Sequence, residues 1–375
     1  MARVATVCVA ALSFGAIAWS QIADPLPRRG FFGVALAAGD DGTVVVASVH
    51  DGSAAAAAGI EPGDVVATVD GRPARSTAET MAMIGAHRGG DRVAIEVVRD
   101  GTVHEIVATL APYPAETMAG ADVTYGSVTL GDGTRLRTIA SVPTGYGGQW
   151  PGVLLLQGGG CGTVDLPWPM PFGIRPLVHL LGTNGFVTMR VEKSGVGDSE
   201  GPPCDAIGYH EELEGYRAAL AALRAHAAVD PERVFLVGIS LGGVFAPILA
   251  NESDVAGIAV YGTIAYAPPP YPGRSERFFA EFAGVDVLAE WANVDAPVLL
   301  LHGEYDEVSP RDGPARIAAA VNGTHPGRAT HRELPRLDHC ATRHATRDAS
   351  LGRCGAGEPT GEADRAILAF LEAHG

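Results

Sequence analysis

Apolar segments alternate with polar turns along the chain, and their spacing changes near residue 120. Between residues 30 and 112, apolar runs of β type are separated by Gly/Asp turns, with one helical run near 76–87. This pattern predicts a small β-rich domain with one principal helix. From residue 122 to 375, short apolar segments such as VLLLQG and VFLVG alternate with amphipathic stretches such as 210–227. Buried strands that alternate with helices predict an α/β fold with a mostly parallel sheet.

Two further segments complete the expected organisation. Residues 113–121 form a short predicted linker between the domains. The first twenty residues hold one charge, Arg3, then an apolar run and small residues at Ala18 and Ser20. Because the run is short for a hydrocarbon core of ~30 Å, residues 1–20 predict a secretory signal peptide, with an uncleaved anchor as the alternative. We therefore expect a periplasmic or extracellular protein without a transmembrane segment after signal cleavage.

The charge and apolar content of the chain limit the kinds of partner that it can bind. The 375 residues carry 27 Lys+Arg against 43 Asp+Glu, a net charge of −16, and 47% of them are hydrophobic. That apolar content excludes a disordered chain. Binding to nucleic acid or anionic lipid is not expected, because it requires clustered basic residues.

The strongest chemical signal is the segment Gly238-Ile239-Ser240-Leu241-Gly242-Gly243, between the apolar run VFLVG and the helical run VFAPILA. A serine on a sharp strand-to-helix turn has its hydroxyl clear of the sheet, and the flanking glycines allow that geometry. This context predicts that Ser240 is a nucleophile. The alternative is a glycine-rich turn in a binding protein.

A serine nucleophile needs a base, and the base needs an acid that fixes its tautomer. Asp306 follows the apolar run PVLLLHG by a few residues, and His339 lies in the later segment LPRLDHC. The order Ser, Asp, His matches the G-x-S-x-G hydrolases. Weaker candidates are Glu304 and Glu307 for the acid and His302, His331 and His344 for the base, and Asp338 is expected to shape its loop.

The oxyanion of acyl transfer requires preorganised donors, which we expect from backbone N–H groups. Leu241, directly after the nucleophile, supplies one. Gly159 in the glycine-rich segment after VLLLQ is expected to supply the other, with Gly158 or Gly160 as alternatives.

Together these motifs resemble the α/β-hydrolases of the esterase, dienelactone hydrolase and serine peptidase group, over nearly all of residues 122–375. The resemblance implies a serine hydrolase that works without a cofactor or metal ion. It also places Glu192, Lys193 and Asp198 in a loop of the pocket wall, where internal salt bridges are their expected role. Gln157 departs from the family, because esterases with this motif commonly have histidine there.

Four cysteines remain once Cys8 is removed with the signal peptide, an even number for an oxidising compartment. Their spacing does not fit a compact zinc site. Within the hydrolase resemblance, bridges between Cys161 and Cys204 and between Cys340 and Cys354 would each hold an active-site loop, and four free thiols are the alternative.

The first domain resembles a bacterial PDZ domain in its segments RGFFGVAL, SVHDGSAAAAAGIEPGDVVATVDGRPARS and GGDRVAIEVVRDG. The resemblance implies capture of a peptide C-terminus by strand addition. Phe31, Phe32 and Gly33 would form the carboxylate-binding loop, Val34 would begin the pairing strand that continues to Leu36, and the facing helix would carry Thr80, Met81 and Ile84. The alternative is that another part of this chain fills the groove.

The leading hypothesis is therefore an exported serine hydrolase that cleaves carboxylic esters through an acyl-enzyme, acting on a small-molecule ester or a peptide. One alternative is a serine peptidase whose substrates are recruited by the PDZ domain. Another is a PDZ interaction protein with an inactive hydrolase domain.

Overall fold

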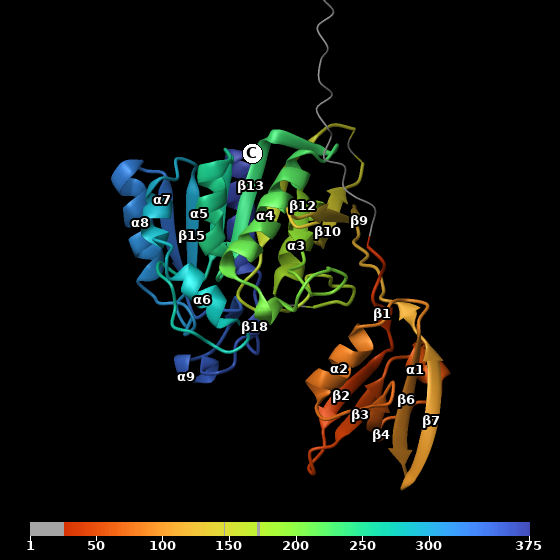
Figure 1. Ribbon diagram of the computed structural model, residues 1–375. Coiled ribbons are helices and arrows are strands. Elements are labelled where there is room, and N and C mark those ends of the chain that lie inside the picture. Colours follow the sequence, from red (N-terminus) through yellow and green to blue (C-terminus); the bar gives the residue numbers. More distant parts are fainter. Residues whose placement is uncertain (1–25, 146, 171–172) are drawn as a thin grey trace, which may run out of the picture.

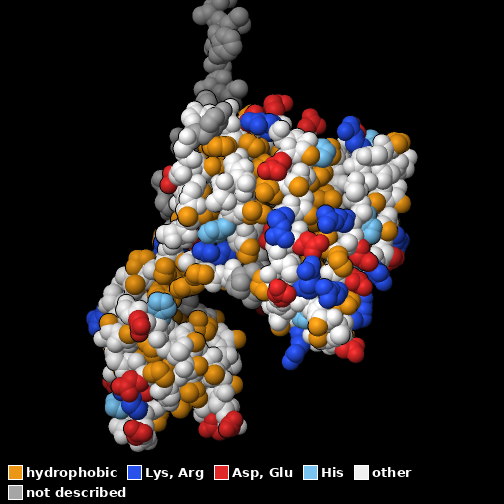
Figure 2. Space-filling model, turned by 180° about the vertical axis from the view of Figure 1, so that it is seen from behind, with side chains coloured by type: hydrophobic (Ala, Val, Ile, Leu, Met, Phe, Trp, Pro, Cys, Tyr) orange, Lys and Arg blue, Asp and Glu red, His pale blue; other side chains and the backbone are white. Residues whose placement is uncertain are grey.

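A computed structural model describes residues 26–145, 147–170 and 173–375 (Figure 1). The predicted signal peptide, residues 1–20, lies outside them. The chain forms a small β-rich domain followed by a larger α/β domain. Figure 2 shows them as two lobes joined at one side, with an open space between their outer parts.

The small domain is built on strands in the order β2-β3-β4-β6-β7, with β5 paired to β4. Alternation along β6 buries Val93, Ile95 and Val97 against helix α2. A strand that is buried on one face shows this alternation, because successive side chains point to opposite faces of the sheet. Its elements are β1 (Gly30–Phe31), β2 (Val34–Ala38), β3 (Val44–Val49), α1 (Ala54–Ala57), β4 (Val65–Val69), β5 (Arg72–Pro73), α2 (Thr77–Gly85), β6 (Arg92–Arg99), β7 (Thr102–Thr109) and β8 (Ala111–Pro112).

The large domain contains an eight-stranded sheet in the order β16-β15-β14-β13-β11-β12-β10-β9. The six strands from β16 to β12 are parallel, and β10 and β9 continue the sheet antiparallel. The strands are β9 (Ala121–Thr129), β10 (Arg135–Pro143), β11 (Trp150–Leu156), β12 (Val187–Val191), β13 (Val229–Ile239), β14 (Gly257–Tyr261), β15 (Val298–Gly303) and β16 (Ala329–Leu334), and the short pair β17 (Thr342–Arg343) and β18 (Glu358–Pro359) lies outside the sheet.

Helices cover both faces of this sheet. Helices α3 and α10 pack on one face, in a core that includes Leu181 and Ile367. Helices α4 to α8 pack on the other, in a core that includes Phe245 and Trp291. The helices are α3 (Ile174–Thr183), α4 (Tyr209–Arg224), α5 (Gly242–Glu252), α6 (Glu276–Phe282), α7 (Val287–Ala292), α8 (Gly313–Thr324), α9 (Arg347–Ser350) and α10 (Glu362–His374), with a 3-10 turn at Cys204–Ala206. This arrangement is the α/β fold expected from the sequence.

The segments on either side of the small domain are packed against the large one. Arg28 lies 2.7 Å from both Asp165 and Asp198. In the stretch expected as a linker, Glu116 forms a buried ion pair with Arg190 at 2.8 Å, and Met118 joins the core under α3. Residues 113–121 are therefore docked onto the α/β domain, because they contribute both an apolar side chain and a charge partner to it.

Every helix in the described ranges is too short or too polar to cross a membrane. Likewise, His, Cys, Asp and Glu side chains in these ranges do not gather into a group that could hold a metal ion.

Candidate active site

Ser240 lies on the turn between β13 and α5, and its backbone is in the left-handed region at φ +54°. A non-glycine residue rarely adopts this conformation, and strain of this kind is concentrated at functional sites. The neighbouring glycines make the turn sterically feasible. A Cβ on Gly242 would lie 2.1 Å from the Leu156 carbonyl oxygen, and one on Gly238 would lie 2.8 Å from the Gly243 nitrogen. The sequence motif thus corresponds to a turn that larger side chains would disrupt.

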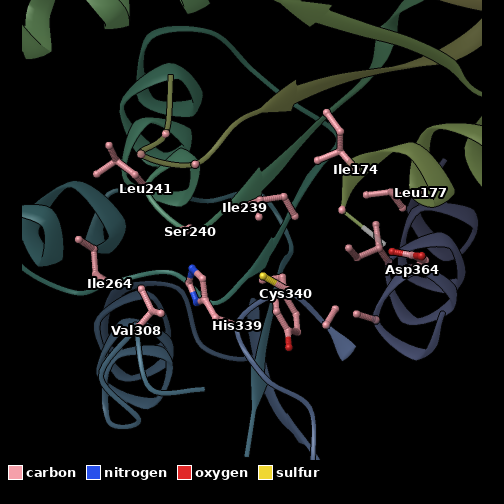
Figure 3. A pocket seen from close by; sticks show the side chains of 18 of the residues that line it. Ile174, Leu177, Ile239, Ser240, Leu241, Ile264, Val308, His339, Cys340 and Asp364 are labelled. Atoms are coloured by element: carbon pink, nitrogen blue, oxygen red, sulfur yellow. The ribbon is translucent and has the colours of Figure 1, made fainter. Parts of the chain in front are cut away.

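Asp306 and His339 meet beside this turn. Asp306 follows β15, and the Nδ1 atom of His339 lies 2.7 Å from its Oδ2 atom. Ser309 supports the carboxylate through its hydroxyl, at 2.6 Å, and through its backbone N–H, at 2.9 Å. Gly262, at φ +62°, makes room, because a Cβ there would lie 3.0 Å from the imidazole. Figure 3 shows the ring of His339 facing the turn that carries Ser240.

The charge state of Asp306 follows from these contacts. Burial acts to raise its pKa, but the hydrogen bonds from His339 and Ser309 outweigh burial and leave the pKa below its ordinary value. An ionised carboxylate can only accept hydrogen bonds, so Nδ1 of His339 carries the proton and Nε2 is free to accept one.

The weaker candidates are engaged elsewhere. Glu304 accepts a hydrogen bond from the Arg336 backbone at 2.9 Å, and Glu307 is exposed. His344 lies 2.9 Å from Asp338, while His302 is buried at the end of β15, 3.8 Å from Asp306. His331 is exposed on the edge strand β16.

Asp338 shapes the loop that carries His339, as expected. Its Oδ1 accepts hydrogen bonds from the backbones of Cys340, at 3.0 Å, and Thr342, at 2.8 Å. Its Oδ2 accepts one from the Gly355 backbone at 2.9 Å. The disulfide between Cys340 and Cys354 closes the same loop, and Cys161 pairs with Cys204 beside the glycine-rich segment.

A buried charge network holds the segment Gly158–Gly160. The Lys193 ammonium donates to the carbonyls of Gly158, at 2.7 Å, and Gly160, at 3.0 Å. Arg274 donates to the Gly159 carbonyl between them at 2.8 Å. Glu212 on α4 joins the two cations, with one oxygen 2.9 Å from Lys193 and the other 2.7 Å from Arg274. All three consecutive carbonyls are therefore bound to cations.

Sequence reasoning expected Lys193 near the site, in an internal salt bridge, but missed Glu212 and Arg274. A usable signal was present, because Lys193 is the one lysine among the 27 basic residues. Gln157, which replaces the family's usual histidine, has a separate role and donates to the Val191 carbonyl at 3.1 Å.

Ser240 and His339 line a cavity of about 600 Å³ at the carboxyl ends of the parallel strands. Gly158–Gly160 and Leu241 line the same cavity, as does Tyr271 from the segment between β14 and α6. Ligand sites of open α/β sheets occur at this edge. The cavity can therefore bring an acyl group to Ser240 beside backbone N–H donors.

The small domain has a second cavity, of about 410 Å³, between β2 and α2. Phe31, Phe32, Gly33 and Val34 line one wall, and Met81 and Ile84 line the other. Thr80 lies on the same helix, as expected, but it is buried, and its hydroxyl donates a hydrogen bond to the Ser76 carbonyl. Among the described strands β2 pairs only with β3, which leaves its other edge unpaired.

The chain is similar to several known proteins. Residues 30–110 match the PDZ domain family. The α/β region is similar to the uncharacterized protein YfhR of Escherichia coli O157:H7, 27% identical over 211 residues, which cover 53% of this chain and 69% of that protein. A stretch of 72 residues is 32% identical to a probable periplasmic DegP-like serine endoprotease of Pseudomonas fluorescens, covering 19% of this chain and 15% of that protein.

Solved structures agree on the fold. An acylaminoacyl peptidase of Pyrococcus horikoshii superposes with a TM-score of 0.54 and 15% identity, covering 76% of this chain and 55% of that one. Est1E of Butyrivibrio proteoclasticus, with ferulic acid bound, has a TM-score of 0.52 and 16% identity, covering 66% of this chain and 98% of that one. The protein thus combines a domain that matches the PDZ family with a domain of α/β-hydrolase fold.

Proposed function

We propose that this protein is an exported serine hydrolase that cleaves carboxylic esters through an acyl-enzyme. The observation that carries the proposal is the 2.7 Å contact between His339 and Asp306 in the cavity that also holds the strained Ser240. In this scheme the Ser240 hydroxyl attacks the ester carbonyl while Nε2 of His339 takes its proton. His339 then protonates the departing alcohol, and water, activated by the same imidazole, releases the acid.

The oxyanion would be bound by the N–H groups of Leu241 and Gly159. Across a trans peptide bond the carbonyl and the following N–H point in opposite directions. The Gly158 carbonyl is bound to Lys193, so the Gly159 N–H faces away from that cation. This arrangement supports Gly159 as a donor, with Gly158 or Gly160 as the alternatives.

Export is supported by the two cysteine pairs, which persist in oxidising compartments, and by the similarity to a periplasmic endoprotease. A panel of p-nitrophenyl esters from short to long acyl chains, run beside aminoacyl and peptidyl amides, tests the substrate class. Turnover of esters alone supports an esterase, and faster turnover of peptidyl amides would replace it with a peptidase.

The unpaired edge of β2 favours a second proposal, that the PDZ groove binds the C-terminus of a peptide. Tyr113 and Trp168 pack on Phe31 and line the groove, while β2 pairs only with β3 among the described strands. Peptide capture in this mode requires such an open edge. A peptidase with recruited substrates is the corresponding alternative function.

Met81→Glu should abolish peptide binding, because it places a charge in an apolar groove wall. The side chain is 46% exposed, so folding should be unaffected. Fluorescence anisotropy with a library of labelled C-terminal peptides measures the effect, and amidation of the terminal carboxylate should also remove binding. Val103→Glu is a matched control, since Val103 is 60% exposed on β7.

Gly33→Val tests the carboxylate loop itself. At φ +84° a Cβ on Gly33 would lie 2.2 Å from the Ser53 side chain, so the loop must distort. If the unaltered full chain binds no library peptide, the groove is structural and recruitment fails.

A further inference from the structure

The cavity that holds Ser240 and His339 extends to both sides of these residues. Figure 3 shows Leu241, Ile264 and Val308 on one side and Ile174, Leu177 and Asp364 on the other. The lining on both sides is mainly apolar. Asp364 is the one carboxylate among the described residues that line it.

Asp364 lies in the first turn of α10 and is partly exposed to the cavity. Within the described ranges it forms no hydrogen bond and no ion pair. Burial raises its pKa to about 6, opposed only by the charge of the adjacent Arg365. At neutral pH the group is therefore ionised, and a carboxylate that lacks a partner in apolar surroundings is costly. A bound cation would remove that cost.

We propose that Asp364 binds an ammonium group of the substrate, so that cationic esters or amino-terminal peptide segments are preferred. This rests on the proposed hydrolase function, because the cavity is the one that holds Ser240. The negative charge of Asp364 favours a cationic ligand. The apolar side chains of Ile174 and Leu177 would contact the carbon chain that carries the ammonium.

Two pairs of isosteric esters test the preference on the full chain. p-Nitrophenyl 6-aminohexanoate and heptanoate differ by an ammonium on the acyl side, and butyrylcholine and 3,3-dimethylbutyl butyrate differ by a cation on the alcohol side. We expect kcat/KM to favour the cationic ester of at least one pair by about tenfold or more, because either cation would be attracted by the carboxylate charge in apolar surroundings. Asp364→Asn should remove the preference, because the amide carries no charge to pair with the cation.

Asp122→Asn, at an exposed position of β9, is the control and should keep the preference. The proposal is overturned if the unaltered protein prefers neither cation, or if Asp364→Asn retains the preference. A binding measurement distinguishes failure of this inference from failure of the proposed catalytic mechanism. A Ser240→Ala chain should still bind the cationic ester of the preferred pair more tightly than its neutral isostere, even if Ser240 is not the nucleophile.

A second inference rests on a different observation, the three acceptors of Lys193. Its ammonium has three N–H bonds and three acceptors, the carbonyls of Gly158 and Gly160 and a carboxylate oxygen of Glu212. A neutral amine has two N–H bonds, so loss of the proton leaves one acceptor unpaired. We infer that Lys193 is a positioning residue whose proton holds the glycine segment in its active geometry.

The charged and titratable groups around Lys193 determine when that proton is lost. Glu212 stabilises the ammonium, while Arg274 opposes it, and Tyr216 and Tyr271 lie beside Glu212 and Arg274. Burial dominates and lowers the pKa of Lys193 to about 8. The charged form therefore predominates below that pH, and kcat should fall as the pH rises through it.

The single lysine makes this test direct, because protein labelled with ¹³C-lysine gives one side-chain resonance. We expect its titration to coincide with the alkaline fall of kcat for a p-nitrophenyl ester. Lys193→Met should lower kcat by about a hundredfold, the scale of a misplaced oxyanion donor, and lack the alkaline fall. A lysine that titrates without a change in kcat would overturn the inference, and this wild-type comparison does not depend on the variant folding.

Discussion

Ser240→Ala should lower kcat for a p-nitrophenyl ester by about a million-fold, the scale seen when a serine nucleophile is removed. The reason is local, since the alanine methyl group cannot form an acyl-enzyme while the turn and the cavity remain. Residual turnover should come from the oxyanion donors and substrate binding alone. Burst and steady-state kinetics with p-nitrophenyl butyrate measure the loss.

An alanine at this position would adopt the same φ of +54° as Ser240. The substitution therefore adds no new backbone strain, and the fold should be retained. Ser253→Ala, after α5, is a matched control that should keep full turnover. Turnover by Ser240→Ala within a factor of ten of the unaltered protein would refute Ser240 as the nucleophile, since the mechanism requires orders of magnitude.

The second large effect is expected for Asp306→Asn, about ten-thousand-fold in kcat. An asparagine can present an N–H to His339, which places the imidazole proton on Nε2 and removes the acceptor that Ser240 needs. The buried contacts of Asp306 with Ser309 make the position sensitive to this exchange.

Glu307→Gln separates charge from position, because Glu307 is adjacent but exposed. It should leave kcat nearly unchanged. Equal losses in the two variants would indicate a general effect of loop charge and would remove Asp306 from the proposed mechanism. Steady-state kinetics from pH 5 to 9 compare them.

Much of the fold could be predicted because its signals are local. The run VFLVG, the motif around Ser240 and the helix after it occupy consecutive residues, and each glycine corresponds to a contact that excludes a Cβ. The α/β-hydrolase and PDZ resemblances rest on such local motifs. The contact between Asp306 and His339 also follows from chain order, since both lie in loops at the same sheet edge.

Other features depend on contacts distant in the sequence. Glu212, Lys193 and Arg274 come from three separate segments and acquire their joint role only when α4 packs beside the loop after β12. Docking of residues 113–121 was likewise invisible, because a lone Glu116 gives no sign of a buried partner such as Arg190. The sequence of α2 also did not show that Thr80 is buried while its neighbour Met81 lines the groove.

The most direct test of the central claim is mass mapping of the protein after reaction with a fluorophosphonate. We expect one adduct, on the peptide that contains Ser240, with labelling lost in Ser240→Ala and strongly slowed in His339→Ala. An adduct on another residue, or ester turnover that persists after complete labelling elsewhere, would contradict it.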